Sequence, residues 1–237
     1  MSEINSVNFE EYASDLIEEW LNLMSQKEYD KANDLCFNFI DNYSLILNKR
    51  LFGQNEKNYN IILIILILFK GLQDYIQLCQ MTQDRDWYKD SKTVECVWIV
   101  LCDSTERIDF ASNYCNSEII ERVVIDIKGL EKFFRDSFGD GMYFSPGIIA
   151  DKSLCNICQK DARACSHIAG RLYDGRICYY QQVNPQIDHI ALVKVPKDPR
   201  CRIWSWQVKD NDQGEGIKID KACVFTTFSI DDFIHKC

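Results

Sequence analysis

Residues 155–178 read CNICQKDARACSHIAGRLYDGRIC, and no other stretch of the 237-residue chain has comparable chemical specificity. The stretch includes four of the twelve cysteines and one of the three histidines. Cys155 and Cys158 form a CxxC pair, and Cys165 and His167 form a second pair after six intervening residues. Thiolate and imidazole are the protein ligands that zinc prefers. The stretch is therefore a candidate metal site.

The two pairs together predict a zinc ion with a tetrahedral Cys3His set, made by Cys155, Cys158, Cys165 and His167. A CxxC turn can direct two thiolates at one ion while backbone amides face the sulfurs. Cys178 is an alternative ligand, which replaces His167 if the loop between Gly170 and Gly175 folds back over the metal. A catalytic zinc site keeps an open coordination position, whereas these four ligands can close the shell. The sequence therefore predicts a structural zinc ion.

A zinc-dependent enzyme acting on nucleic acid is the alternative interpretation. It would place His167 or His189 near the metal and use Asp161 or Asp188 as acid or base. The standard catalytic patterns are incomplete, because the deaminase HxE is missing and neither HExxH nor a GxxxxGK[ST] or GxGxxG phosphate loop occurs. A redox role for CxxC would need a βαβ setting, which the surrounding sequence does not indicate. The sequence favours a protein with no catalytic residues.

The segment from His167 to Cys178 has Gly170, Tyr173 and Gly175 in regular placement, which suggests sharp backbone turns around the metal with Tyr173 packed across them. In this respect it resembles the short Cys/His zinc knuckles and ribbons found in many otherwise unrelated proteins. A longer segment, from Ser145 to Ile203, looks like parts of uncharacterised bacterial proteins associated with mobile elements or phage defence. The resemblance implies a role in an antiviral defence assembly and transfers no active site.

Charge, glycine and proline all shift near residue 140. Residues 1–140 have a net charge of −11 and residues 141–237 a net charge of +2. Seven of the ten glycines and all four prolines lie in residues 139–237. We therefore predict an acidic helical domain over 1–140 and a zinc-binding β-rich module over 141–237. The acidic domain is a poor candidate for nucleic-acid binding, because it would repel phosphates.

Apolar residues recur at helical spacing through most of the first domain. The predicted helices cover 8–25, with Asn8 as N-cap, and 29–47, 58–80, 93–101 and 118–138. A strand is the alternative for 93–101, because periodicity alone does not distinguish the two in so short an apolar run. The run IILIILILF at 61–69 is too short for a membrane span, which needs about 20 apolar residues. It predicts a buried central helix, and no membrane partner is expected.

Short aromatic and β-branched segments separated by turn formers characterise the second module. The predicted strands are 142–150, 176–183, 189–195, 201–208 and 222–228, and Ser229 is expected to cap a closing helix. The whole chain is therefore predicted to be α+β, with an all-helical domain followed by a small antiparallel module.

Arg202, Trp204 and Trp206 alternate along one predicted strand and so share one face of it. Such a face can stack single-stranded nucleic acid, which gives the module a possible nucleic-acid-binding role. The more usual reading of this pattern is core or a protein interface.

These features favour a non-catalytic, zinc-binding interaction or regulatory subunit of a larger assembly, with another protein as its partner. A cytoplasmic location is expected, because the start of the chain does not have the pattern of a signal peptide. Cysteines within the helical patterns are expected to be free and buried rather than in disulfides, at Cys36, Cys79, Cys96 and Cys102.

Overall fold

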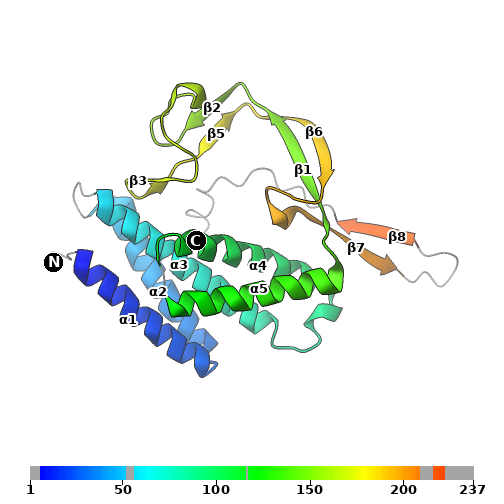
Figure 1. The fold of residues 1–237 in the computed structure, drawn as a ribbon, viewed down its shortest axis with the longest axis horizontal. Helices are drawn as coiled ribbons and strands as arrows, with labels where there is room; N and C mark the ends of the chain where they lie inside the picture. Colours follow the sequence, from blue (N-terminus) through cyan, green and yellow to red (C-terminus); the bar gives the residue numbers. More distant parts are fainter. Residues whose placement is uncertain (1–5, 52–55, 116, 209–215, 222–237) are drawn as a thin grey trace. The chain divides into compact units, whose positions relative to one another are not determined.

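The computed structural model describes residues 6–51, 56–115, 117–208 and 216–221 (Figure 1). The chain divides into two compact units, Met1–Lys132 and Phe133–Cys237. Helices make up the first unit, and small antiparallel sheets follow in the second. This arrangement confirms the predicted α+β class. The predicted boundary at residue 140 lies just beyond the last helix, whereas the compact units divide inside that helix.

Each of the five predicted helices is present among the described residues. They are α1 (Ser6–Ser25), α2 (Tyr29–Lys49), α3 (Glu56–Met81), α4 (Ser91–Ser112) and α5 (Glu118–Phe138). Ser117 caps α5, because its Oγ accepts a hydrogen bond from the Ile120 N–H at 3.2 Å. Gly139 ends the same helix with a φ of 74°, a left-handed conformation that glycine adopts without strain. The N-cap predicted at Asn8 is wrong, since α1 already begins at Ser6.

The central helix of the first unit is α3, which packs against α2 and α4. Phe69 of α3 stacks on Phe39 of α2 with ring centroids 4.0 Å apart. By length and composition α3 could cross a membrane, but 67% of its most apolar window is buried inside the structure. The prediction that residues 61–69 belong to a buried helix is confirmed.

The fourth helix continues well beyond its predicted end at residue 101. Polar residues follow residue 101 and interrupt the apolar pattern on which the prediction was based. Two of them have partners on α3: Ser104 donates to the Gly71 carbonyl, and Arg107 pairs with Asp74 at 2.5 Å. The helix continues past its apolar run, and the neighbouring helix supplies partners for these two polar side chains.

The main sheet of the second unit has the order β6-β1-β7-β8, with all neighbours antiparallel. Its strands are β1 (Met142–Ile149), β6 (Gln186–Val193), β7 (Arg202–Val208) and β8 (Gly216–Lys221). Two smaller sheets pair β2 (Lys152–Cys155) with β5 (Tyr180–Val183), and β3 (Leu172–Tyr173) with β4 (Arg176–Ile177).

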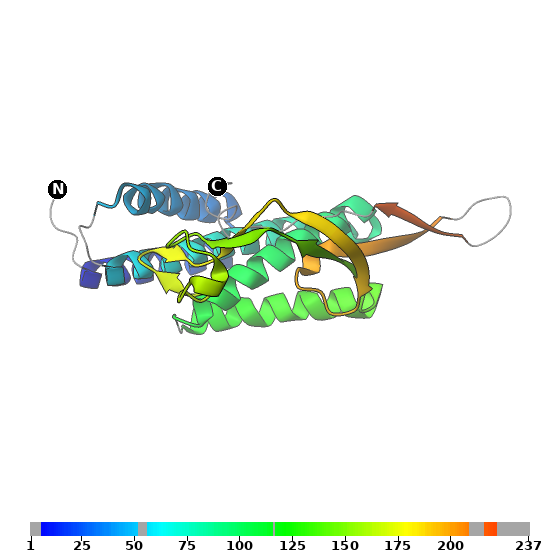
Figure 2. The same cartoon turned by 90° about the horizontal axis from the view of Figure 1, so that it is seen from above.

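Strands β1 and β2 follow each other along one side of a long antiparallel ribbon, and β5 and β6 follow each other along the other side (Figures 1 and 2). The N–H of Asp151 donates to the Val183 carbonyl at 3.1 Å and links the two halves of the ribbon. The chain between Cys155 and Tyr180 closes one end. The Cys/His stretch, residues 155–178, therefore lies at this closed end of the ribbon.

The strand predicted over 176–183 is interrupted at Cys178 and becomes β4 and β5. Strands β2, β3 and β8 were not predicted. Such short strands are stabilised by their pairing partners, which a local pattern does not reveal. The strand predicted over 222–228 and the helix predicted from Ser229 lie outside the described residues.

Candidate metal centre

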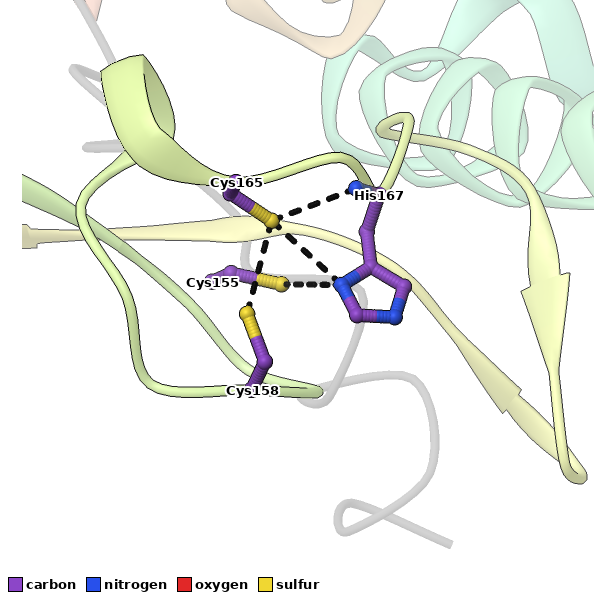
Figure 3. Close-up of side chains that lie close together, drawn as sticks. All are labelled: Cys155, Cys158, Cys165 and His167. Atoms are coloured by element: carbon purple, nitrogen blue, oxygen red, sulfur yellow. Dashed lines mark hydrogen bonds between the residues drawn. The ribbon is translucent and has the colours of Figure 1, made fainter.

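A tight turn at the end of β2 presents the first two cysteines. The Gln159 N–H donates to the Cys155 carbonyl at 2.8 Å, and the Cys155 N–H donates to the Lys160 carbonyl at 2.9 Å. Gln159 takes a left-handed conformation with a φ of 58°, which turns the chain immediately after Cys158. The CxxC segment is thereby folded back on itself, so that both thiols lie on its inner side (Figure 3).

A short 3₁₀ turn, Ala162–Ala164, leads to the second pair. Asp161 caps this turn, because its carboxylate accepts hydrogen bonds from the Arg163 N–H at 3.0 Å and from the Arg163 Nε at 2.8 Å. These bonds from Arg163 hold the pKa of Asp161 well below its usual range. The carboxylate is therefore ionised and used for local structure. Its place in the turn does not support the acid or base role considered for it.

The ligand atoms of Cys155, Cys158, Cys165 and His167 all lie within 4.8 Å of one another (Figure 3). The Sγ atoms of Cys158 and Cys165 are 3.5 Å apart. The Nδ1 atom of His167 lies 3.3 Å from the Cys165 Sγ and 3.7 Å from the Cys155 Sγ. Zinc bonds of about 2.0–2.3 Å place tetrahedral ligand atoms about 3.5–3.8 Å apart. The sequence-predicted residues are thus brought together at distances that could hold a metal ion.

Backbone amides favour the ionised form of the Cys155 thiol. Burial raises its pKa, but hydrogen bonds from the Cys158 and Ile157 N–H groups and from the Cys165 and Cys178 thiols together outweigh burial and lower the pKa to about 6. The N–H of His167 also faces a sulfur, the Cys165 Sγ, at 3.3 Å. Since the thiolate is the metal-binding form of cysteine, the turn prepares the site for a cation.

Two tyrosines hold His167. The Tyr173 ring meets the imidazole edge to face, with centroids 4.6 Å apart and an interplanar angle of 89°. Its hydroxyl oxygen accepts a hydrogen bond from the Ile168 N–H at 3.1 Å. The Tyr180 hydroxyl donates to the His167 carbonyl at 2.5 Å. Tyr173 therefore packs across the turn as expected, whereas the part played by Tyr180 had no signal in the sequence.

Cys178, the alternative ligand, is fully buried next to the four-residue group. Its Sγ lies 3.8 Å from the Cys155 Sγ. Burial raises the pKa of the Cys178 thiol to about 11, and the neighbouring Cys155 adds to this effect. The loop between Gly170 and Gly175 does fold back, since the Gly170 N–H donates to the Cys178 carbonyl at 2.8 Å, but His167 and not Cys178 belongs to the group whose ligand atoms lie within 4.8 Å of one another.

Asp188 and His189 lie elsewhere, as an exposed pair on β6. The Asp188 carboxylate is 2.9 Å from the His189 Nδ1. The imidazole covers Gly147 on β1 so closely that a Cβ atom there would lie 2.3 Å from the ring. Neither residue belongs to the Cys/His group. Of the two histidines considered for the enzymatic alternative, His167 lies in the Cys/His group and His189 does not.

Arg202 and Trp204 are buried, with 4% and 8% of their surface exposed. The Arg202 guanidinium lies over the Trp204 ring at 4.5 Å and donates to the Phe138 and Gly139 carbonyls. The predicted binding face is therefore corrected for these two residues, because they stabilise the end of α5 and are not free to stack bases. The side chain of Trp206 lies outside the described part of the structure.

No family model matches the chain, and neither a curated protein nor a solved structure matches it.

Proposed function

We propose that this chain binds one structural zinc ion through Cys155, Cys158, Cys165 and His167. The observation that carries the proposal is the closed group of three sulfurs and one imidazole nitrogen, all within 4.8 Å of one another. Calcium and magnesium prefer oxygen ligands, whereas closed Cys3His sets are typical of structural zinc. Backbone N–H groups that donate to the Cys155 sulfur and favour its thiolate form also support the proposal.

The role of the ion is to stabilise the closed end of the β ribbon. The sheets around it are very small, since β3 and β4 have two residues each and β2 and β5 have four each. Small folds of this kind rarely bury enough apolar surface to be stable without a metal or another cross-link. In small zinc-binding peptides, the metal contributes about 10–16 kcal/mol of binding free energy, which becomes folding free energy.

Metal analysis tests this proposal. The protein purified from zinc-supplemented medium should contain one zinc per chain by elemental mass spectrometry, and Cys158→Ser should contain far less. Cys96→Ser is the matched control, because Cys96, which was wrongly predicted to be buried, is an exposed cysteine on α4 and its loss should leave the metal content unchanged. A wild-type protein that neither contains zinc nor takes it up would contradict the proposal.

The chain acts, on this proposal, as a non-catalytic binding or regulatory subunit in the reducing cytoplasm, with another protein as partner. Support comes from exposed apolar side chains on β6, with 50–60% of their surface exposed, at Ile187, Ile190 and Leu192, which pair with alternate residues of β1 and so share one face. Apolar groups gathered on an exposed surface often mark a protein interaction site. Participation in an antiviral defence assembly remains a prediction from the resemblance alone.

The partner proposal is tested by affinity purification from the source cells. A specific protein should copurify with the wild type and be lost with Leu192→Asp, which places a charge on the exposed apolar strand. Gln186→Asp is the control, because Gln186 is also exposed on β6 but is polar. A stable monomer with no copurifying protein would argue strongly against this role.

A further inference from the structure

The metal centre has a fifth donor atom within reach. The Cys178 Sγ lies 3.8 Å from the Cys155 Sγ, which is the spacing of two sulfurs bound to one tetrahedral zinc at about 2.3 Å. Cys155 and Cys178 are both fully buried. A tetrahedral ion takes four ligands, so the five donors cannot all bind at once.

The chain around Cys178 is held on both sides by Asn156, which lies between the two cysteines of the CxxC pair. The Asn156 side chain donates to the Ile177 carbonyl at 3.0 Å and accepts from the Tyr179 N–H at 2.9 Å. Its backbone N–H donates to the Tyr179 carbonyl at 3.1 Å. These three bonds fix the chain on each side of Cys178 and place its thiol beside the metal centre.

The hairpin of β3 and β4 holds the same residue from the other direction. The Cys178 N–H donates to the Arg171 carbonyl, and the Cys178 carbonyl accepts from the Gly170 N–H, both at 2.8 Å. His167, in contrast, lies in the loop before the hairpin and is only partly buried. A buried thiol fixed in this way and a histidine on a loop compete for one coordination position.

We propose that the fourth coordination position of the metal alternates between the His167 Nδ1 and the Cys178 Sγ, with Cys155, Cys158 and Cys165 as constant ligands. This inference rests on the proposed zinc site. In the exchange the metal–Nδ1 bond breaks, a metal–Sγ bond forms, and the proton of the Cys178 thiol passes to the released imidazole. Atoms and charge balance without another reactant. The metal therefore stays bound when either of the two alternating ligands is lost.

Cobalt substitution tests the proposal, because the absorption of tetrahedral Co2+ distinguishes four-sulfur from three-sulfur, one-nitrogen coordination. His167→Ala should bind one Co2+ with the four-sulfur spectrum, and Cys178→Ser should bind one with the three-sulfur, one-nitrogen spectrum. Each single variant should keep an affinity within about tenfold of the wild type. The affinity of the double variant for Co2+ should fall at least about 100-fold, which exceeds the usual effect of removing a residue that only hydrogen-bonds to a ligand.

Asn156→Ala gives a second measurement that keeps every ligand in place. In the His167→Ala background it should weaken Co2+ binding about tenfold or more, because only Cys178 can then complete the shell. Asn184→Ala is the matched control, since this asparagine bonds the Asp151 side chain on the same ribbon and is exposed. It should leave the affinity unchanged.

The proposal is overturned if His167→Ala loses Co2+ as completely as Cys158→Ser does. It is also overturned if the His167→Ala spectrum indicates three sulfurs and does not change when Cys178 is replaced by serine. In both of these cases the wild type still binds metal, and the proposed zinc site stands. A wild type that binds no metal would overturn the zinc site and the exchange together.

Discussion

At the scale of single residues, hydrogen bonds to the backbone decide which side chains reach the candidate metal centre. Tyr180 belongs to β5, yet its hydroxyl reaches the carbonyl of His167, the residue whose ring faces the cysteines. Asn156 acts in the same way on the chain around Cys178. Neither residue is a ligand. Both orient the chain that carries one, and such contacts adjust metal affinity.

In the Cys178→Ser background, where only His167 can complete the shell, Tyr180→Phe is expected to weaken metal binding about 10-fold or more, because it removes the hydroxyl that holds His167 and leaves the ring in place. The measurement is competition for zinc against a chelator of known affinity. Tyr114→Phe, at an exposed position in the helical unit, is the control and should have no effect. Equal affinities for both variants would show that the hydroxyl does not position His167.

At the scale of elements, α3 and α4 approach closely because a glycine lies between them. A Cβ atom on Gly71 would lie 2.9 Å from the Ile108 Cδ1 and 3.2 Å from the Arg107 Cβ. Ile108 is fully buried and has little room to move. The same contact zone includes the Ser104 hydrogen bond to the Gly71 carbonyl. The absence of a side chain at Gly71 therefore allows the packing of the two helices.

Gly71→Ala is expected to destabilise the helical unit by about 1 kcal/mol, because overpacking costs about 1–3 kcal/mol and better helix propensity returns at most about 1 kcal/mol. Gly129→Ala is the comparison, since nothing lies within 4 Å of its added Cβ. That variant should stabilise α5 by up to about 1 kcal/mol. Urea unfolding measures both, and stabilisation of equal size in both variants would contradict the close approach.

At the scale of the whole molecule, two different sources of stability serve the two units. The first unit has a large apolar core on α3, including the fully buried Phe69 and Leu72. In the second unit, the closed end of the ribbon has Cys155, Gly175, Ile177 and Cys178 as its buried residues among those described. Removal of the metal should therefore affect one unit far more than the other.

Chelation is expected to unfold the closed end of the ribbon while the helices persist. Hydrogen exchange followed by mass spectrometry should show loss of amide protection over residues 152–183 and unchanged protection over residues 56–81. Restoring zinc should restore the protection. Full removal of the metal without any change over 152–183 would mean that the ion does not stabilise the ribbon.

Local patterns in the sequence were sufficient to predict the five helices, most strands of the main sheet and the four residues of the Cys/His group. Helical periodicity and ligand spacing are properties of neighbouring residues, so they can be read without the rest of the chain. The full length of α4 could not be predicted, because its polar residues find their partners on α3. The same holds for β2, which exists through its pairing with β5.

What the sequence determined by itself is the helical periodicity and a compact group of ligands in two closely spaced pairs. The tertiary structure alone decided that Arg202 and Trp204 are buried and that Cys178 lies beside Cys155. The physical reason is that burial and distance depend on what packs against a residue from remote parts of the chain. The spacing of cysteine and histidine along the sequence indicates candidate ligands. The folded backbone determines which of these side chains come close enough to bind one metal ion.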